Sequence, residues 1–436
     1  SWMKLCKGAV LALAISYGLI YCHTNKSKFM LEQKGDSLTL IHITNPTNYI
    51  LLPIEEEAEE SWVRLDIGDA ADTDMDIRLA QTKVDYWVPF VLPADAKTVT
   101  VRVQKSLGDA LCWKEMKLSD TFDPSHTDKF RPVYHHAPLY GWMNNANGLV
   151  YEDEEYHLYY QYNPYGSKWG NMHWGHSISK DLMHWEHLAP AIVRDTLGHI
   201  FSGSSIVDQE NVAGYGTGTI LAFYTSASDK NGQIQCLAYS NDNGRTFTKY
   251  DKNPILRSSD RRKDFRDPKV FWYAPGNKWI MIVAADKEMC FYDSEDLKDW
   301  NYMSSFGEGY GVQPCQFECP DMVELPVDGD TEHKKWVLIV NVNPGCYFGG
   351  SATQYFIGDF DGTRFICDSK PDVTKWLDWG KDHYATVSFS NMGRRVIVVP
   401  WMSNWQYCNN VPTKPFRGVN ALPRELGLYT QSGDIY

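Results

Sequence analysis

The sequence predicts an all-β protein in which a small N-terminal β-sandwich precedes a five-bladed β-propeller. Short segments rich in Val, Ile and Thr alternate between apolar and polar residues, and no helical period competes with them. A turn motif also recurs along the second part of the chain. With 436 residues, of which 43% are hydrophobic and 14% aromatic, the chain has ample material for a core and for two or three domains.

The N-terminal part reads as a β-sandwich over residues 23–128. Its clearest strand segments, bounded by Pro, Gly, Asn and Asp, are 37–45, 61–68, 85–93 and 97–104. Residues 119–132 are polar and contain two prolines, which predicts a linker after this domain.

The repeated turn lies in residues 133–426 and follows an apolar strand each time. Its copies begin at Ser179, Ser240, Ser294 and Asp359, so successive copies start 61, 54 and 65 residues apart. A unit of four strands at this length is typical of a propeller blade, and about 300 residues accommodate five blades. An array of β-sandwiches is the alternative. In a propeller the inner strands face one central channel, so residues far apart in sequence can meet there.

The first 22 residues resemble an export signal. A basic start around Lys4 and Lys7 is followed by the uncharged apolar run 8–21. Cys22 then stands where a bacterial lipoprotein carries its lipid, although Tyr21 replaces the usual small residue. We therefore expect an exported protein, at the cell surface or in the periplasm, with membrane anchoring through Cys22. A plain signal peptide and a buried helix are the alternatives.

Composition narrows the classes of ligand. The net charge of −13 disfavours nucleic acid as a partner. The 16 Trp and 26 Tyr residues favour a neutral carbohydrate, because the C–H face of a sugar packs on aromatic rings, although all-β proteins are often aromatic-rich. No CxxC pair is present among the ten cysteines, which argues against a zinc cluster and for buried free thiols.

Four local motifs carry groups suited to chemistry. They are Trp142–Gly148, which holds three asparagines and no carboxylate, Trp169–Trp185, Phe265–Pro268 and Gln316–Asp321. A single Asp or Glu is most often a solvated surface residue, and an Asp-Pro pair is often a turn. Glu318 is less ordinary, because a carboxyl between Phe317 and Cys319 is suited to general-acid chemistry.

Together these motifs resemble glycoside hydrolase family 32, the invertases, inulinases and levanases that act on β-fructofuranosides. The resemblance runs from about His136 to Leu426. In the family the first loop reads Trp-Met-Asn-Asp-Pro-Asn-Gly, and some members carry Ala for Pro. The family fold is a five-bladed propeller, usually followed by a C-terminal β-sandwich. Residues 427–436 would begin that region, so we expect that this domain is missing and the chain is a fragment, unless the N-terminal sandwich substitutes for it.

The resemblance also implies roles for individual residues. Asn145 stands at the position of the nucleophile, where Asp is expected. Asp267 would stabilise the transition state and Glu318 would act as acid and base. The implied substrate-binding residues are Asn144, Gln161, Trp169, Trp174, Phe201, Ser202, Arg266, Asp382 and Trp401. For the aromatic residues, Trp174 and Trp401 above all, core packing is the alternative.

The expected function follows from two carboxyl groups. A retaining glycosidase needs one carboxylate as nucleophile and a second, protonated carboxyl for the leaving oxygen, with no metal or organic cofactor. Asparagine keeps the shape of aspartate but is a poor nucleophile, so we predict a hydrolase of levan, inulin or fructo-oligosaccharides whose turnover is impaired. The rival hypothesis is a catalytically inactive fructan-binding protein at the cell surface. An engineered substitution and a natural non-catalytic relative would give the same sequence. Linkage preference, endo or exo action and oligomeric state stay open.

Overall fold

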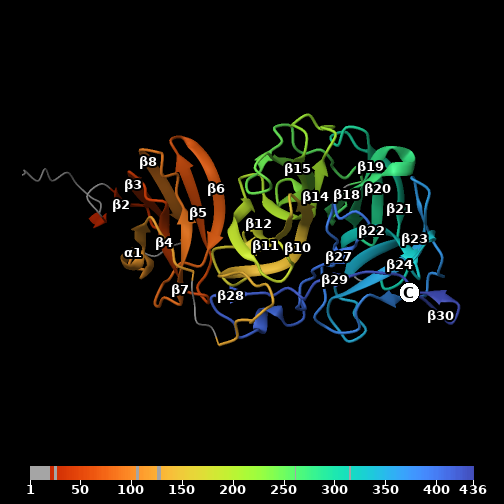
Figure 1. Ribbon diagram of the computed structural model, residues 1–436. Helices are drawn as coiled ribbons and strands as arrows, with labels where there is room; N and C mark the ends of the chain where they lie inside the picture. The colour runs from red at the N-terminus through yellow and green to blue at the C-terminus, as the bar shows by residue number, and fades with distance from the viewer. Residues whose placement is uncertain (1–19, 24–26, 105–107, 125–128, 261, 314–315) are drawn as a thin grey trace, which may run out of the picture. The chain divides into compact units, whose positions relative to one another are not determined.

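The computed structural model describes residues 20–23, 27–104, 108–124, 129–260, 262–313 and 316–436. The chain divides into two compact units, Ser1–Phe122 and Asp123–Tyr436, which are described separately (Figure 1). Most of the predicted export segment, together with Cys315, lies outside the described residues, and only the backbone of Cys22 is described. Within the described ranges, no helix is both long and apolar enough to cross a membrane.

The described residues of the first unit form two antiparallel sheets and one short helix, α1 (Cys112–Glu115). The larger sheet has the order β1 (Ile20–His23), β2 (Ser27–Lys34), β3 (Leu38–Thr44), β8 (Thr98–Gln104), β5 (Ser61–Ile67) and β6 (Ala70–Ile77), and the smaller has β7 (Tyr86–Val91), β4 (Tyr49–Ile54) and β9 (Lys117–Ser119). The four segments with the clearest alternation form β3, β5, β7 and β8. In β8, Val99, Val101 and Val103 are buried, as a period of two requires.

The second unit is a five-bladed β-propeller. The first blade contains β13 (Glu186–Ile192), β12 (His173–Ser179), β11 (Glu155–Asn163), β10 (Gly141–Glu152) and β28 (Phe416–Arg417); the second contains β14 (His199–Asp208), β15 (Thr219–Ser228), β16 (Gly232–Ser240) and β17 (Thr248–Lys249). The third contains β18 (Phe265–Tyr273), β19 (Lys278–Ala285), β20 (Glu288–Ser294) and β21 (Asn301–Phe306); the fourth contains β22 (Phe317–Val327), β23 (Asp330–Val342), β24 (Ala352–Phe360), β25 (Phe365–Cys367) and β26 (Lys375–Trp376).

The fifth blade is the least regular. Its strands β27 (Ile397–Val398) and β29 (Arg424–Glu425) pair with each other, and single bridges join Tyr384 to Trp401 and Ser388 to Val398. The hairpin of β30 (Thr430–Gln431) and β31 (Asp434–Ile435) follows.

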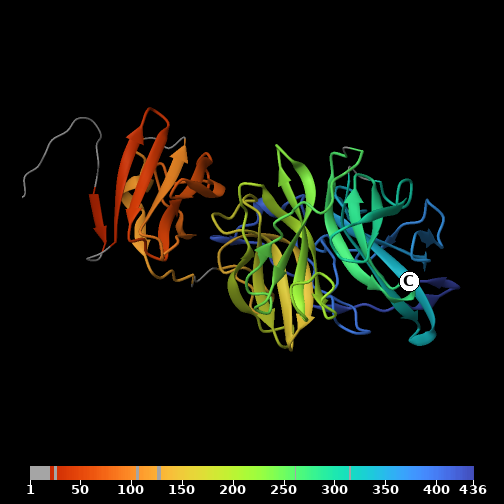
Figure 2. The ribbon, with the colours of Figure 1, turned by 90° about the horizontal axis from the view of Figure 1, so that it is seen from above.

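The core of this unit lies between the blades rather than inside one layer. Among its described residues, a hydrophobic cluster fills each junction of neighbouring blades. In ring order these clusters unite Trp174 with Tyr224, Phe223 with Val283, Ile282 with Leu338, Ile339 with Val396, and Tyr384 with Leu158. Each blade therefore buries both of its faces, and the sheets of the second and third blades stand side by side (Figure 2).

The repeated sequence motif forms the same turn in different blades. In the first copy, Ser179 Oγ accepts the N–H of Leu182 at 2.8 Å and Asp181 Oδ1 accepts that of His184 at 2.8 Å. The copy that begins at Ser294 repeats both bonds at 2.9 and 2.8 Å. These side-chain bonds hold a leucine at a positive φ of 67° or 68° in the two turns. The motif therefore forms the same hydrogen-bonded turn in two blades.

The ring is closed by main-chain bonds between the last segments of the unit and β10. Gly141 N–H donates to Pro415 at 2.9 Å, and β10 pairs in parallel with β28. At the other end of β10, the backbone N–H of Tyr151 donates to the carbonyl of Ser390 at 3.0 Å. The inner strand of the first blade is therefore hydrogen-bonded to segments from the C-terminal part of the chain.

Candidate active site

The inner strands of four blades carry a β-bulge at the same level of the channel. The register shifts lie between Met143 and Ala146 in β10, Ile200 and Gly203 in β14, Arg266 and Lys269 in β18, and Glu318 and Asp321 in β22. A bulge re-aims side chains that a regular strand would direct into the sheet. Each of the four bulges contains or borders at least one residue predicted to belong to the site. Two of the bulged residues, Asp267 and Cys319, have positive φ values of 66° and 48°, a conformation that non-glycine residues adopt only where neighbouring contacts hold them.

One small cavity shows that the five inner segments converge. Its lining includes Asn147 of the first blade, Ser202 of the second, Asp267 of the third, Cys319 of the fourth and Val387 of the fifth. The predicted meeting of distant motifs at one channel is therefore present in the geometry.

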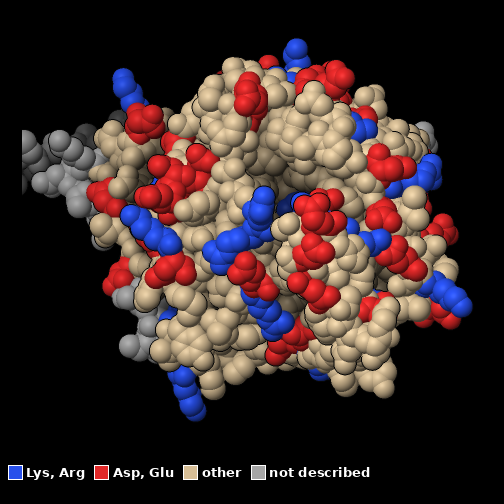
Figure 3. All heavy atoms as spheres, turned by 45° about the vertical axis from the view of Figure 1, so that its right-hand side comes forward, with Lys and Arg blue, Asp and Glu red and all other residues tan. Residues whose placement is uncertain are grey.

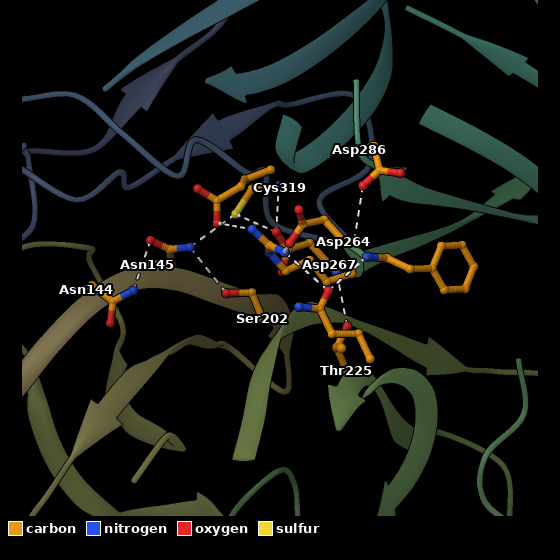
Figure 4. A network of polar contacts seen from close by, with 12 residues as sticks. Asn144, Asn145, Ser202, Thr225, Asp264, Asp267, Asp286 and Cys319 are labelled. Atoms are coloured by element: carbon orange, nitrogen blue, oxygen red, sulfur yellow. Dashed lines mark hydrogen bonds and ion pairs between the residues drawn. The ribbon is translucent and has the colours of Figure 1, made fainter. Parts of the chain in front are cut away.

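The side chain of Asn145 contacts two residues that line this cavity, Ser202 and Cys319, and is almost fully buried (Figure 4). Its Nδ2 donates to Ser202 Oγ at 3.4 Å and to Cys319 Sγ at 3.3 Å, and its Oδ1 accepts from Asn144 Nδ2 at 3.1 Å. The amide is held by donors and acceptors from three blades, so its position is defined although it carries no charge.

Asp267 is held from both sides. Its backbone N–H donates to Thr225 Oγ1 at 3.0 Å, and its Oδ2 accepts the backbone N–H of Cys319 at 2.9 Å. Burial raises the pKa of Asp267 to about 6, against the attraction of the Arg266 guanidinium and with a smaller contribution from the Glu318 charge. The carboxylate is therefore desolvated and aimed at the channel.

Glu318 lies between a cation and a phenol. Arg266 Nη2 is 3.4 Å from Glu318 Oε2, while Arg266 Nη1 donates to Asp264 at 2.7 Å. The hydroxyl of Tyr384, from the fifth blade, donates to Glu318 Oε1. Burial alone would lower the pKa of Arg266, but the three nearby carboxyl groups outweigh it and raise that pKa above its ordinary value. Arg266 thus stays charged and ties Glu318 to the third blade.

The remaining predicted residues surround this centre at different depths. Asn144 accepts from Trp142 Nε1 at 2.9 Å, and Gln161 donates to the carbonyl of Ile200 at 3.0 Å; both are buried. Trp169 is 41% exposed, and its ring stacks on His199 and meets Phe201 edge-on. Trp169 and Phe201 therefore form an aromatic rim.

Two predicted positions differ from the expectation. Trp174 and Trp401 are fully enclosed by protein side chains in the junctions between blades, where Trp174 Nε1 donates to the carbonyl of Phe201 at 2.9 Å, so neither ring forms a pocket wall. The core alternative holds for both. Asp382 accepts a hydrogen bond from the hydroxyl of Tyr407 and lies two residues before Tyr384, which contacts Glu318.

The sequence did not identify two residues, Tyr384 and Cys319, that contact the predicted site residues. Tyr384 lies two residues after the predicted Asp382, but nothing in its spacing indicated that it contacts Glu318. Cys319 was expected to be a buried thiol; it is 2% exposed, and burial raises its pKa well above the ordinary value. Its backbone N–H donates to Asp267 and its sulfur accepts from Asn145, so Cys319, at a positive φ, connects positions 267 and 145.

The arrangement is suited to acid–base chemistry on a neutral substrate. It combines one cation with three carboxyl groups around a buried amide, and an aromatic rim stands beside it. Acidic and basic side chains are interspersed on the hollowed face seen in Figure 3, with no extended basic surface on that face. Carboxyl groups in such a setting can serve general acid–base chemistry and can stabilise positive charge.

Comparison with known proteins relates both units to described families. Residues 135–436 match the N-terminal domain of glycosyl hydrolases family 32, and residues 35–134 match a domain of unknown function, DUF4980. The chain is 50% identical over 318 residues to a levanase of Bacillus subtilis, covering 71% of this chain and 46% of the levanase. The chain therefore spans about half the length of this relative.

Solved structures agree with this relationship. The exo-inulinase from Aspergillus awamori is 37% identical with a TM-score of 0.67, covering 72% of this chain and 67% of that one. The β-fructofuranosidase from Schwanniomyces occidentalis, complexed with fructosyl-erythritol, is 40% identical with a TM-score of 0.66, covering 70% and 61%.

Proposed function

The chain belongs to glycosyl hydrolase family 32, and on that premise we propose that it is a β-fructofuranosidase of retaining type that acts on fructans. The observation that carries the proposal is the gathering of Asp267, Glu318 and Arg266 around position 145. The substrate would be levan, inulin or a fructo-oligosaccharide. The names of the relatives, levanase and exo-inulinase, support this class.

Each group would have one task in the reaction. Glu318 would protonate the oxygen of the departing sugar and then accept a proton from water. Asp267 would bind ring hydroxyls and stabilise the positive charge that develops on the fructosyl ring. A carboxylate at position 145 would attack the anomeric carbon and form the covalent intermediate. Asn145 lacks that anionic oxygen, so the chain as printed would hold the substrate and turn it over slowly.

The decisive experiment compares the printed chain with Asn145→Asp. Release of reducing sugar from levan, inulin and sucrose should rise by several orders of magnitude in Asn145→Asp, since loss of a nucleophile commonly costs that much. Glu318→Gln in the Asn145→Asp background should remove the gain. Equal and vigorous turnover by the printed chain and Asn145→Asp would place the nucleophile elsewhere and end the proposal.

A second candidate function is fructan capture without turnover, which Asn145 favours. Calorimetric titration of the printed chain with a fructo-oligosaccharide would show binding under either function. Only a pure binding protein would stay inactive after Asn145→Asp, because its remaining groups would no longer be in catalytic register. The intact set Arg266, Asp267 and Glu318 favours the enzyme.

Export is proposed from the apolar segment before Cys22, and a relative is named an extracellular exo-inulinase. Attachment to the cell surface through a lipid on Cys22 would be tested by fatty-acid labelling of the printed chain and of Cys22→Ser. Label in both variants, or in neither, would exclude lipidation at this cysteine.

A further inference from the structure

A second cavity, of about 540 Å³, opens at the other end of the channel. We call it the far pocket; it is lined by segments 206–212, 269–272, 322–323 and 388–393 and by Trp279. On four of the five inner segments its residues lie four positions beyond a residue of the catalytic centre, as in Ser202 and Ile206, Asp267 and Phe271, Glu318 and Met322, and Tyr384 and Ser388. Lys269 lines both the small cavity beside Asp267 and the far pocket, so the two cavities adjoin at this residue.

A buried ion pair separates the far pocket from the catalytic centre. Lys269 Nζ is 3.4 Å from Asp321 Oδ1 and donates to the carbonyl of Ser388 at 3.1 Å, while Asp321 Oδ2 accepts the N–H of Ser388 at 2.6 Å. These bonds join the third, fourth and fifth blades across the channel. They also neutralise Lys269, so its ammonium group gives the far pocket no net positive charge.

The lining of the far pocket has the chemistry of a sugar site. Trp272 is 44% exposed, its ring meets that of Trp279 edge-on with centroids 5.1 Å apart, and both indole rings line the cavity. Gln209 and Glu210 are exposed on the rim, and no described residue bonds either side chain. An aromatic plane beside an amide and a carboxylate matches the C–H faces and hydroxyls of a neutral sugar, and the size is that of a small-ligand pocket.

We propose that the far pocket is a non-catalytic binding site for a neutral oligosaccharide, and specifically for the fructosyl units of the polymer that the catalytic centre acts on. The choice of fructan rests on the proposed function. Trp272 would stack on a furanose ring, Gln209 would donate hydrogen bonds to and accept them from its hydroxyls, and the Glu210 carboxylate would accept them. A polymer bound at both ends of the channel dissociates more slowly than one bound at a single site, because the second contact is intramolecular.

The test is native gel electrophoresis of the full chain through gels that contain increasing levan. Trp272→Ala and Glu210→Gln should each weaken retardation by levan by roughly tenfold in apparent Kd. Tyr302→Ala is the matched control, because Tyr302 is an aromatic residue 61% exposed on β21 that does not line the far pocket. Asp267→Ala weakens levan binding at the catalytic centre, so the retardation that this variant still shows should come from the far pocket. Adding Trp272→Ala to Asp267→Ala should abolish it.

The outcomes separate this inference from the proposed function. Retardation of Trp272→Ala and Glu210→Gln equal to that of Tyr302→Ala would overturn the inference while leaving catalysis untouched. If Asn145→Asp releases no fructose and Asp267→Ala binds levan as the printed chain does, the proposed function fails instead. A dimer that Trp272→Ala converts to a monomer would assign the far pocket to a second copy and also overturn the inference. Glu210→Gln, a change of one exposed side chain, keeps the test valid if Trp272→Ala does not fold.

Discussion

The side-chain amide of Asn145 donates a hydrogen bond to the thiol of Cys319 at 3.3 Å, and the backbone N–H of that same cysteine donates to Asp267 at 2.9 Å. One residue therefore sets the spacing between position 145 and the Asp267 carboxylate, and it adjoins Glu318. A neutral amide suits this place, because it adds no charge to a centre that already holds several buried carboxyl groups.

Asn145→Asp should lower the free energy of unfolding at pH 7 by about 1–3 kcal/mol while it raises turnover. The new carboxylate would be buried beside Asp267 and could no longer donate to Ser202 Oγ or Cys319 Sγ. Chemical denaturation of the printed chain and of Asn145→Asp at pH 7 measures the difference. A more stable Asn145→Asp would contradict this account of the amide.

Tyr384→Phe, made in the Asn145→Asp background, should reduce kcat by about 10- to 100-fold with little change in KM. The ring stays packed in its cluster, but Glu318 loses the hydroxyl that fixes one of its oxygens. Steady-state kinetics on sucrose and a pH profile give the readout, since a purely structural role would not alter the profile. Unchanged kcat would remove Tyr384 from the catalytic machinery.

Asp267→Asn should be increasingly more stable than the printed chain as the pH rises from 4 to 7. The pKa of Asp267 is raised to about 6 by burial, from an ordinary 3.8. A raised pKa contributes stability that is fully present below 3.8 and is lost as the pH rises through 6, while asparagine does not titrate. The difference between Asp267→Asn and the printed chain should grow by on the order of 3 kcal/mol over this range. A difference that is flat with pH would show that the carboxyl is not desolvated.

Buried histidines should make the fold sensitive to acid. Burial lowers the pKa of His136 and His173 to about 3, and that of His157 and His187 to about 4. A lowered pKa contributes stability that is present above the ordinary 6.5 and is lost as the pH falls toward 4. Each such histidine should remove about 1.4 kcal/mol per pH unit. Urea unfolding at pH 7, 6 and 5 should therefore show a falling midpoint; constant stability would refute neutral burial of these rings.

The ion pair between Lys269 and Asp321 should show strong coupling in a double-mutant cycle. Lys269→Met or Asp321→Asn alone should cost about 3–5 kcal/mol, and the double variant much less than the sum, because each single change leaves a buried charge unpaired. The pair of Arg395 and Glu425, at 56% and 53% side-chain exposure, is the control and should show about 0–1 kcal/mol. Equal coupling in both pairs would contradict the burial argument.

The all-β fold could be predicted from the sequence because its strands and turns depend on local patterns. Alternation in 97–104 produced a strand with Val99 and Val101 buried, and the turn that begins at Ser179 recurs in the structure as in the sequence. The site centre was accessible because the motifs around Asn145 and Glu318 resemble a known family. Local patterns carry less information about which side of a blade a ring occupies. The resemblance implied that Trp174 and Trp401 bind substrate, with core packing as the alternative, and both rings pack between blades.

Closure of the ring by β10 and residues near Pro415 also governs the order in which the molecule can assemble. During synthesis the first blade emerges long before its partner segments exist, and the inner edge of β10 then presents unpaired N–H and C=O groups. An edge in that condition can pair with another nascent chain. High-level expression should therefore favour aggregation between nascent chains. Slower synthesis, or a chaperone that binds the unfolded chain, should raise the yield of soluble protein.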